Sequence, residues 1–258
     1  MPLLFVSHGA PSIALADDDY TRALRRYGAA LANVPAIVLV SAHWQESDPV
    51  RVNAVPHPEP IYDFGGFAPE LYRLRYDAPG DPALAREIAA LLDGAGIEAR
   101  LEAARGWDHG LWVPMRHLLP DAATPVVEIS LPLRATPRRL MAIGAALAPL
   151  RDRGIVLAGS GGIVHNLRRI AFDAEDAPVD AWARSFDDWV HARLAAADVE
   201  ALTDYEREAP FANLAVPTTE HFDPLFVILG ALRPTDRLAT IHEGFMYANL
   251  SMRTFAFA

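Results

Sequence analysis

Short apolar runs alternate with amphipathic stretches along this chain, and the alternation restricts its fold more than any other sequence feature. Runs of four or five apolar residues bounded by Gly, Ser or Pro are typical of buried strands. Amphipathic stretches of 10 to 16 residues lie between them and indicate helices. The sequence therefore predicts an α/β protein: a three-layer α/β/α sandwich around a mostly parallel, mixed sheet. The expected buried strands are Leu3–Val6, Ala36–Val40, Pro125–Ile129 and Ile155–Ala158.

The remaining expected elements follow from the same patterns. Asp81 and Thr136 are the expected N-caps of two helices that begin with proline. No repeat or linker divides the chain, so residues 1–258 are expected to form a single domain. Edge or antiparallel strands are expected at Val50–Val55, Leu71–Tyr76, Leu238–His242 and Arg253–Phe257. Helices are expected at Asp17–Ala32, Pro82–Leu92, Pro137–Leu150, Asp180–Leu194 and Asp223–Leu232.

Two residue types are missing, and their absence excludes several kinds of chemistry. The chain contains no cysteine, and all 23 of its cationic side chains are arginine, because no lysine occurs. Lysine Schiff bases, Walker-type phosphate loops, thiol nucleophiles, disulfides and cysteine-held metal centres are therefore excluded.

Charge and hydropathy limit the classes of binding partner that this protein can have and the cellular compartment in which we expect it. A net charge of −10 at pH 7 argues against nucleic acid and anionic membranes, which bind concentrated basic surfaces. The N-terminus has no signal-peptide pattern, and no segment has the roughly 20 apolar residues of a membrane span. We therefore expect a soluble, cytoplasmic protein, with an oligomeric state that the sequence leaves open.

A histidine follows three of the expected buried strands. The first strand continues into SHG at 7–9, the second into SAH at 41–43, and a later strand into GSGGIVH at 159–165. The carboxyl ends of parallel strands line one crevice in open α/β sheets, and ligands bind there. Neutral imidazole is a common ligand of Zn and Fe, so His8, His43 and His165 form a candidate metal site. For each histidine alone, the alternative is an ordinary loop or core residue.

Two further histidines lie in settings that suit catalysis. His109 follows an aspartate and is flanked by glycine and tryptophan, which suits an acid–base residue on a tight loop facing the substrate. His221 precedes an apolar helix. The alternatives are a turn histidine at the start of a helix for His109 and ordinary N-cap chemistry around His221. The other histidines are not expected to act in the site: His57, His117, His191 and His242.

The stretch at 158–162 also permits a different class of function. AGSGG approximates the G-x-S-x-G elbow that presents a nucleophilic serine between a strand and a helix. Ser160 would then be the nucleophile of a hydrolase, with His221 or His242 as its base. This alternative leaves His8 and His43 without a role.

Five ordered motifs together resemble the class III extradiol ring-cleavage dioxygenases of the LigB-like superfamily, and most closely the DOPA 4,5-dioxygenase type. They span positions 7 to 225 and thus nearly the whole chain. The motifs are SHGAP at Ser7–Pro11, SAHW at Ser41–Trp44, DHGLWVPM at Asp108–Met115, GSGGIVHNL at Gly159–Leu167 and EHFDPL at Glu220–Leu225.

The resemblance implies one divalent metal per chain, with Fe(II) expected for activity and Zn(II) able to occupy the purified protein. The implied metal ligands are His8, His43 and His221, and His165 is either a fourth ligand or an acid–base residue. The implied catalytic histidines are His109, which faces the substrate, and His165. The implied reaction opens the ring of a small aromatic diol with O₂.

Neighbouring residues suggest how the site is supported. Asp108 is expected to orient an imidazole. Four aromatic side chains are expected either to form the wall of the substrate pocket or to pack in the core: Trp44, Trp107, Trp112 and Phe222. Two other functions stay open at this point, a metal-binding protein of this fold without oxygenase activity and a hydrolase that uses zinc-bound water or Ser160.

Overall fold

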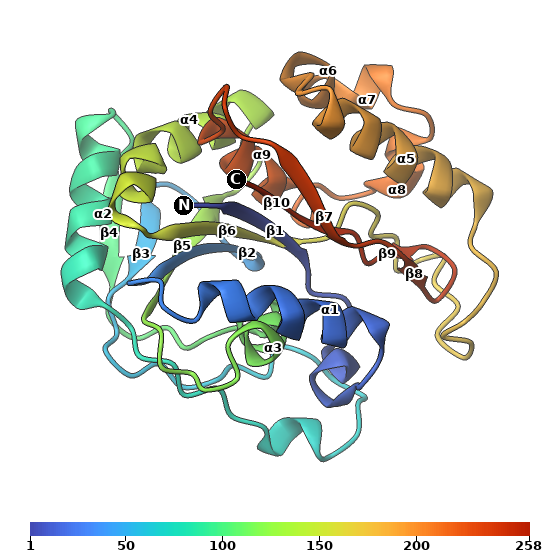
Figure 1. The fold of residues 1–258 in the computed structure, drawn as a ribbon, viewed down its shortest axis with the longest axis horizontal. Helices are drawn as coiled ribbons and strands as arrows, with labels where there is room; N and C mark the ends of the chain where they lie inside the picture. Colours follow the sequence, from blue (N-terminus) through green and yellow to red (C-terminus); the bar gives the residue numbers. More distant parts are fainter.

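An eight-stranded mixed sheet crosses the molecule in the computed structural model, which describes residues 1–258 (Figure 1). The strand order is β4-β3-β5-β2-β6-β1-β10-β7, so strands from the two ends of the chain, β1 and β10, are neighbours in the sheet. A two-stranded hairpin, β8 with β9, stands apart from this sheet. The strands are β1 Leu3–Ser7, β2 Ile37–Glu46, β3 Val50–Asn53, β4 Ala99–Glu102, β5 Val126–Pro132, β6 Val156–Gly161, β7 Leu238–His242, β8 Phe245–Met246, β9 Leu250–Ser251 and β10 Thr254–Phe257.

The four central strands run parallel. β6 pairs with β1 on one side and with β2 on the other, and β2 also pairs with β5. Antiparallel pairs occur farther out, between β3 and β5, β1 and β10, and β10 and β7. The carboxyl ends of β1, β2 and β6 therefore meet at one edge of the sheet, as the sequence pattern predicted.

Helices cover both faces of the sheet and complete the predicted three-layer sandwich (Figure 1). One face carries α1 Asp19–Gly28 and α3 His109–Leu118. The other carries α2 Pro82–Gly94, α4 Pro137–Leu147, α5 Ala181–Ala195 and α9 Asp223–Gly230. Short helices complete the chain: α6 Val199–Thr203, α7 Tyr205–Glu208, α8 Ala212–Ala215, η1 Pro11–Leu15, η2 Ala29–Leu31, η3 Leu71–Arg73 and η4 Ala148–Arg153.

Local sequence chemistry explains where two of the helices begin. The side chain of Asp81 accepts hydrogen bonds from the backbone N–H groups of Ala83 and Leu84, and Thr136 accepts one from Arg139. Both predicted N-caps are thereby confirmed. Proline follows each cap at a position where its missing N–H group costs no helical hydrogen bond.

Three expectations about local structure are wrong. The segment 71–76 is a turn of 3₁₀ helix followed by irregular chain, because Leu71 and Tyr76 bury their side chains against the α3 face without a partner strand. Residue 109 begins a helix rather than lying in a tight loop, because Asp108 accepts the N–H group of Leu111. Strand β2 continues past Val40 to Glu46, so His43 lies within a strand and not after it.

No helix in this chain has the length and apolar character that crossing a membrane requires.

A buried polar network lies where α3 meets β2 and β5, and it fixes the backbone next to His43. Arg105 donates hydrogen bonds to the backbone carbonyl of His43 at 3.2 Å and to Asp108 at 2.9 Å. Asp108 also accepts the Ser41 hydroxyl at 2.7 Å. Glu128 on β5 is fully buried beside them, and neither of its carboxyl oxygens has a hydrogen-bond partner.

The two neighbouring carboxyl groups differ in ionisation. Burial, together with the nearby charge of Asp108, raises the pKa of Glu128 well above its ordinary value. Burial also acts to raise the pKa of Asp108, but the adjacent Glu128 carboxyl, the Ser41 hydroxyl and the Arg105 guanidinium outweigh it and hold that pKa below its ordinary value. Of the two carboxyl groups, Asp108 therefore ionises first, and Glu128 keeps its proton to a higher pH.

This difference predicts how stability depends on pH. The folded protein holds a proton on Glu128 that the unfolded chain releases above its ordinary pKa of 4.5, so the free energy of unfolding falls as the pH rises from there. Glu128→Gln keeps the shape of the side chain and removes its titration. In Glu128→Gln we expect Tm to fall less steeply than in the unaltered protein between roughly pH 5 and 8. Each kcal/mol by which the loss of unfolding free energy is reduced should make the fall of Tm about 2–4 °C smaller. Glu98→Gln, on the surface, is the control, and parallel Tm profiles for all three proteins would contradict the assignment.

Candidate metal centre

Five histidines converge at the carboxyl edge of the sheet. His8 follows β1, His43 lies near the end of β2, His109 is the first residue of α3, His165 follows β6 and His221 precedes α9. The ring centroids of His8, His43 and His221 lie 4.8 to 5.1 Å apart in all three pairs. His109 lies 3.9 Å from His43, and His165 stacks on His221 at 3.4 Å. The structure thus brings together every histidine that the sequence singled out.

Glycines allow this close approach at two places. A Cβ atom on Gly110 would lie 2.4 Å from the Ser41 hydroxyl oxygen and 3.0 Å from His43, so α3 could not begin so near β2 with another residue. A Cβ atom on Gly161 would lie 2.1 Å from the carbonyl oxygen of His221. The N–H group of Gly162 donates to that same carbonyl at 2.8 Å and holds the start of α9 against the end of β6.

Oxygen atoms occupy the Nδ1 side of four of the rings. His8 Nδ1 lies 3.0 Å from the Ser160 hydroxyl oxygen, and Ser160 donates its own proton to the carbonyl of Gly110. His221 Nδ1 lies 3.1 Å from Glu220. Because these oxygens accept hydrogen bonds, we assign the ring proton to Nδ1 and the lone pair to Nε2.

Asp63 holds the other two rings. One of its carboxylate oxygens accepts both the Nδ1–H group of His109 at 2.9 Å and the backbone N–H group of His109 at 3.1 Å. The other oxygen lies 3.5 Å from Nδ1 of His43. The sequence predicts that Asp108 orients an imidazole, but Asp108 caps α3, and Asp63 makes these contacts instead. The only sequence signal for Asp63 is a carboxylate in the aromatic and glycine-rich run YDFGGF at 62–67.

Burial favours the neutral form of four of the imidazoles. Burial first, and the neighbouring histidines second, lower the pKa of His8 and of His221 well below the ordinary value. Burial also lowers the pKa of His43 and the pKa of His165, each to about 4. Neutral imidazole is the form that binds metal ions.

The arrangement of donor atoms fits a divalent metal ion. Nε2 of His8 and Nε2 of His43 lie 3.0 Å apart, and in His8 the proton assigned to Nδ1 leaves the lone pair of Nε2 free. Two imidazole nitrogens this close together can bind one metal ion. His8, His43 and His109 each offer a ligand atom within 4.8 Å of the others, and His165, Glu220 and His221 form a second such group. Oxygen acceptors behind the ligating rings are a regular feature of histidine metal sites.

A mostly apolar cavity of about 250 Å³ opens above this cluster. All five histidines line it, with Asp63 and a set of apolar side chains from the loops on either side. The volume is slightly below the roughly 300–1,000 Å³ of sites for drug-sized ligands, so it suits a single aromatic ring with a short substituent. The apolar lining residues include Phe64, Phe67, Leu167, Ile170, Phe172 and Leu250.

The aromatic wall differs from the one that the sequence suggested. The four expected side chains pack in the core, each at most 1 % exposed, and none of them lines the cavity: Trp44, Trp107, Trp112 and Phe222. Phe64 and Phe67 take that place from the loop after β3. Phe64 meets His109 edge to face at 5.6 Å and Trp112 at 6.2 Å, so the core tryptophan supports the wall from behind.

Ser160 is not placed as a nucleophile. It lies inside β6, is fully buried, and engages both His8 and the carbonyl of Gly110. A nucleophile elbow instead exposes its serine on the turn between strand and helix. The four histidines set aside by the sequence analysis lie outside the cluster and the cavity: His57, His117, His191 and His242.

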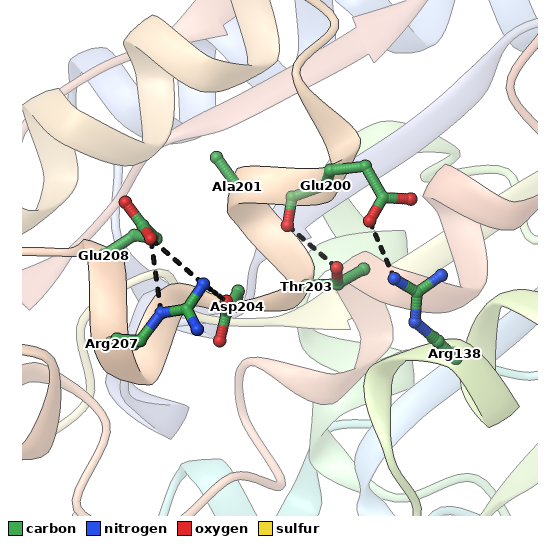
Figure 2. Close-up of a pocket in the computed structure, with 7 residues that line it drawn as sticks. All are labelled: Arg138, Glu200, Ala201, Thr203, Asp204, Arg207 and Glu208. Carbon is green, nitrogen blue, oxygen red and sulfur yellow. Dashed lines mark hydrogen bonds and ion pairs between the residues drawn. The ribbon is translucent and has the colours of Figure 1, made fainter.

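A second hollow, of about 540 Å³, lies between α4 and the α6–α7 segment (Figure 2). Arg138 pairs with Glu200 at 2.7 Å, and Arg207 pairs with Asp204 and Glu208 (Figure 2). These side chains are well exposed, and each charge already faces an opposite one. Such exposed pairs are typical of a solvated protein surface.

Comparison with known proteins identifies the family. Residues 3–258 match the family described as the catalytic LigB subunit of aromatic ring-opening dioxygenase. A 4,5-DOPA dioxygenase extradiol of Escherichia coli (strain K12) is 39% identical over 98% of this chain and 93% of its own length. One from Beta vulgaris is 35% identical over 98% of this chain and 95% of its own length.

A solved structure agrees with these sequence matches. The crystal structure of an uncharacterized protein from Escherichia coli K12 superposes with a TM-score of 0.84 at 34% identity, and the match covers 100% of both chains. The five motifs, the fold and the histidine cluster agree with this result. The chain therefore belongs to the LigB family of extradiol ring-cleavage dioxygenases.

Proposed function

We propose that this protein is a metal-dependent extradiol dioxygenase that opens the ring of a small catecholic substrate with O₂. The observation that carries the proposal is the 3.0 Å approach of Nε2 of His8 to Nε2 of His43, at the floor of a cavity of aromatic size. Two imidazole nitrogens this close together can bind one metal ion, and the substrate space lies directly above them.

His8, His43 and His221 are the proposed metal ligands. Their rings form a nearly equilateral triangle, and the oxygens of Ser160, Asp63 and Glu220 lie behind them. Three histidines on one face leave positions open, and Fe(II) bound there would supply a site at which a catechol and O₂ bind side by side. Zinc is expected to compete for the same nitrogen ligands.

His109 and His165 are the proposed acid–base residues. Asp63 holds the Nδ1–H group of His109, so Nε2 of His109 is free to accept a proton from a catechol hydroxyl group in the cavity. His165 lines the cavity from the opposite loop, stacked on His221, and is either a second proton-transfer group or a fourth ligand. A positioned acid or base contributes roughly 10²- to 10⁴-fold to the rate.

Oxygen consumption tests the proposed reaction. The protein is reconstituted with Fe(II) without air, and O₂ uptake and absorbance are then followed with a panel of catechols. We expect uptake of one O₂ for each catechol and a coloured, ring-opened product, because ring cleavage incorporates both oxygen atoms. Protein loaded with zinc is the control and should consume no O₂.

The contrary outcomes point to other functions. No uptake by fully iron-loaded protein across the panel would oppose the dioxygenase and favour a metal-binding role. Ester hydrolysis that a chelator abolishes would instead favour a zinc hydrolase, and hydrolysis lost only in Ser160→Ala would favour a serine hydrolase.

Histidine variants separate ligands from acid–base residues. We expect His8→Ala and His43→Ala to lose both bound metal and turnover, because each removes a ligand nitrogen from a buried site. His109→Ala should keep its metal and lose about 10²-fold or more in kcat. Metal per chain, measured by elemental analysis, is the primary readout, with the exposed His57→Ala as the control.

Two results would change the assignment. Full metal content in His43→Ala would oppose this site altogether. Metal lost from His109→Ala but kept in His221→Ala would exchange the roles of these two residues, since both rings lie next to the His8–His43 pair.

Asp63 is the proposed positioning residue for two of the rings. Asp63→Asn leaves one oxygen to accept a hydrogen bond where the carboxylate has two, so His43 and His109 can no longer both be held as they are. Losing such a partner costs roughly 10- to 100-fold in metal affinity or activity, and we expect that loss here. Metal titration and kcat are measured together, with the surface variant Asp77→Asn as the control; unchanged values for both would oppose the role.

A further inference from the structure

Building on the proposed function, we infer that the preferred substrates are catechols whose ring substituent is uncharged and apolar. The inference concerns the part of the cavity that lies beyond the histidines. The inference depends on the apolar side chains that line this part of the cavity and on the absence of cationic side chains from its lining.

The outer walls of the cavity are apolar on both sides. Phe64 and Phe67 form one wall, and their rings meet edge to face at 5.5 Å. Leu167, Ile170 and Phe172 also line the cavity, from the segment that follows His165. A substituent that leaves the ring away from the histidines is therefore enclosed by hydrocarbon, which favours an apolar group.

Two of these side chains are exposed as the structure stands. Leu167 is 53% exposed and Phe172 is 58% exposed, which makes them two of the seven large hydrophobic side chains of the chain with such exposure. Both lie at the mouth of the same cavity. An apolar substituent would cover them and remove their surfaces from water, whereas a charged one would not.

No cationic side chain lines the cavity. Its only charged lining residue is Asp63, and the carboxylate of Glu220 lies behind His221. The chain has no lysine, and the nearest arginines in sequence, Arg168 and Arg169, are exposed and do not line the cavity. A carboxylate on the substrate would therefore be desolvated beside Asp63 without a cationic side chain as its partner.

A matched pair of ligands tests the inference by binding rather than by turnover. We would titrate 3,4-dihydroxyphenylpropionate and its methyl ester into zinc-loaded protein by isothermal titration calorimetry. The two molecules share ring and chain and differ in charge, and zinc holds the site without consuming the ligand. We expect the ester to bind about tenfold more tightly or better, since the acid must bury an unpaired charge.

A variant pair tests the cause of the preference. Leu167→Arg places a guanidinium at the mouth of the cavity, where it remains in contact with water, and should bring the ester-to-acid affinity ratio to one or below. Leu167→Gln is the matched control: it makes the position polar without charge, so the preference for the ester should persist. A preference that is the same in Leu167→Arg and Leu167→Gln would oppose a role for the missing cation.

The outcomes separate this inference from the proposed function. Equal or tighter binding of the acid by the unaltered protein would overturn the inference, while catechol binding that requires metal would still support the dioxygenase. Failure of both ligands to bind the metal-loaded protein would overturn the proposed function and the inference with it.

Discussion

The parallel pairing of β6 with β1 and with β2 is the constraint on which the rest of this site depends. Because the three strands are neighbours that point the same way, the residues that follow them arrive at one edge of the sheet. His8 and His43 come together there although 35 residues separate them in the chain. Helix α9 brings His221 to the same edge, since the backbone of Gly162 binds the carbonyl of His221 and Gly161 leaves room for it. The histidine cluster is therefore built on strands and helix ends, which hold side chains more rigidly than loops do.

Gathering five imidazoles in a buried cluster would be costly if they were charged. Burial lowers the pKa of four of them, and hydrogen bonds to Ser160, Asp63 and Glu220 fix the nitrogen that carries the remaining proton in His8, His109 and His221. These contacts hold imidazole nitrogens close to one another, an arrangement that a bound cation would stabilise. We expect metal loading to stabilise the fold, by an amount set by its affinity and concentration.

The parts of the fold and of the site that the sequence predicts are those with a local sequence pattern. The apolar strands and the histidines after them are local patterns, so β1, β2, β5, β6 and the candidates His8, His43 and His165 were accessible from sequence. Asp63 and Phe64 were not, because the chain between β3 and α2 has no periodicity and its place over the site depends on long-range packing. The tryptophans near the motifs were candidates for the wall of the pocket. Trp44 and Trp107 instead pack in the core, where large rings bury the most surface. A motif indicates that a residue lies near a site, but it does not indicate whether the side chain points into the pocket or into the core.

The division between polar floor and apolar walls also follows from this architecture. The floor is supplied by strand ends and helix starts, whose spacing is fixed by the sheet, so the positions of the histidine side chains have little freedom to vary. The walls come from two loops, around Phe64 and around Ile170, that pack on the floor mainly through apolar side chains. Exchanging one such side chain alters the shape or charge of the cavity without disturbing a strand. In this fold the histidine cluster is therefore tied to the sheet, whereas the shape and charge of the cavity are tied to the loops, and the two can change independently.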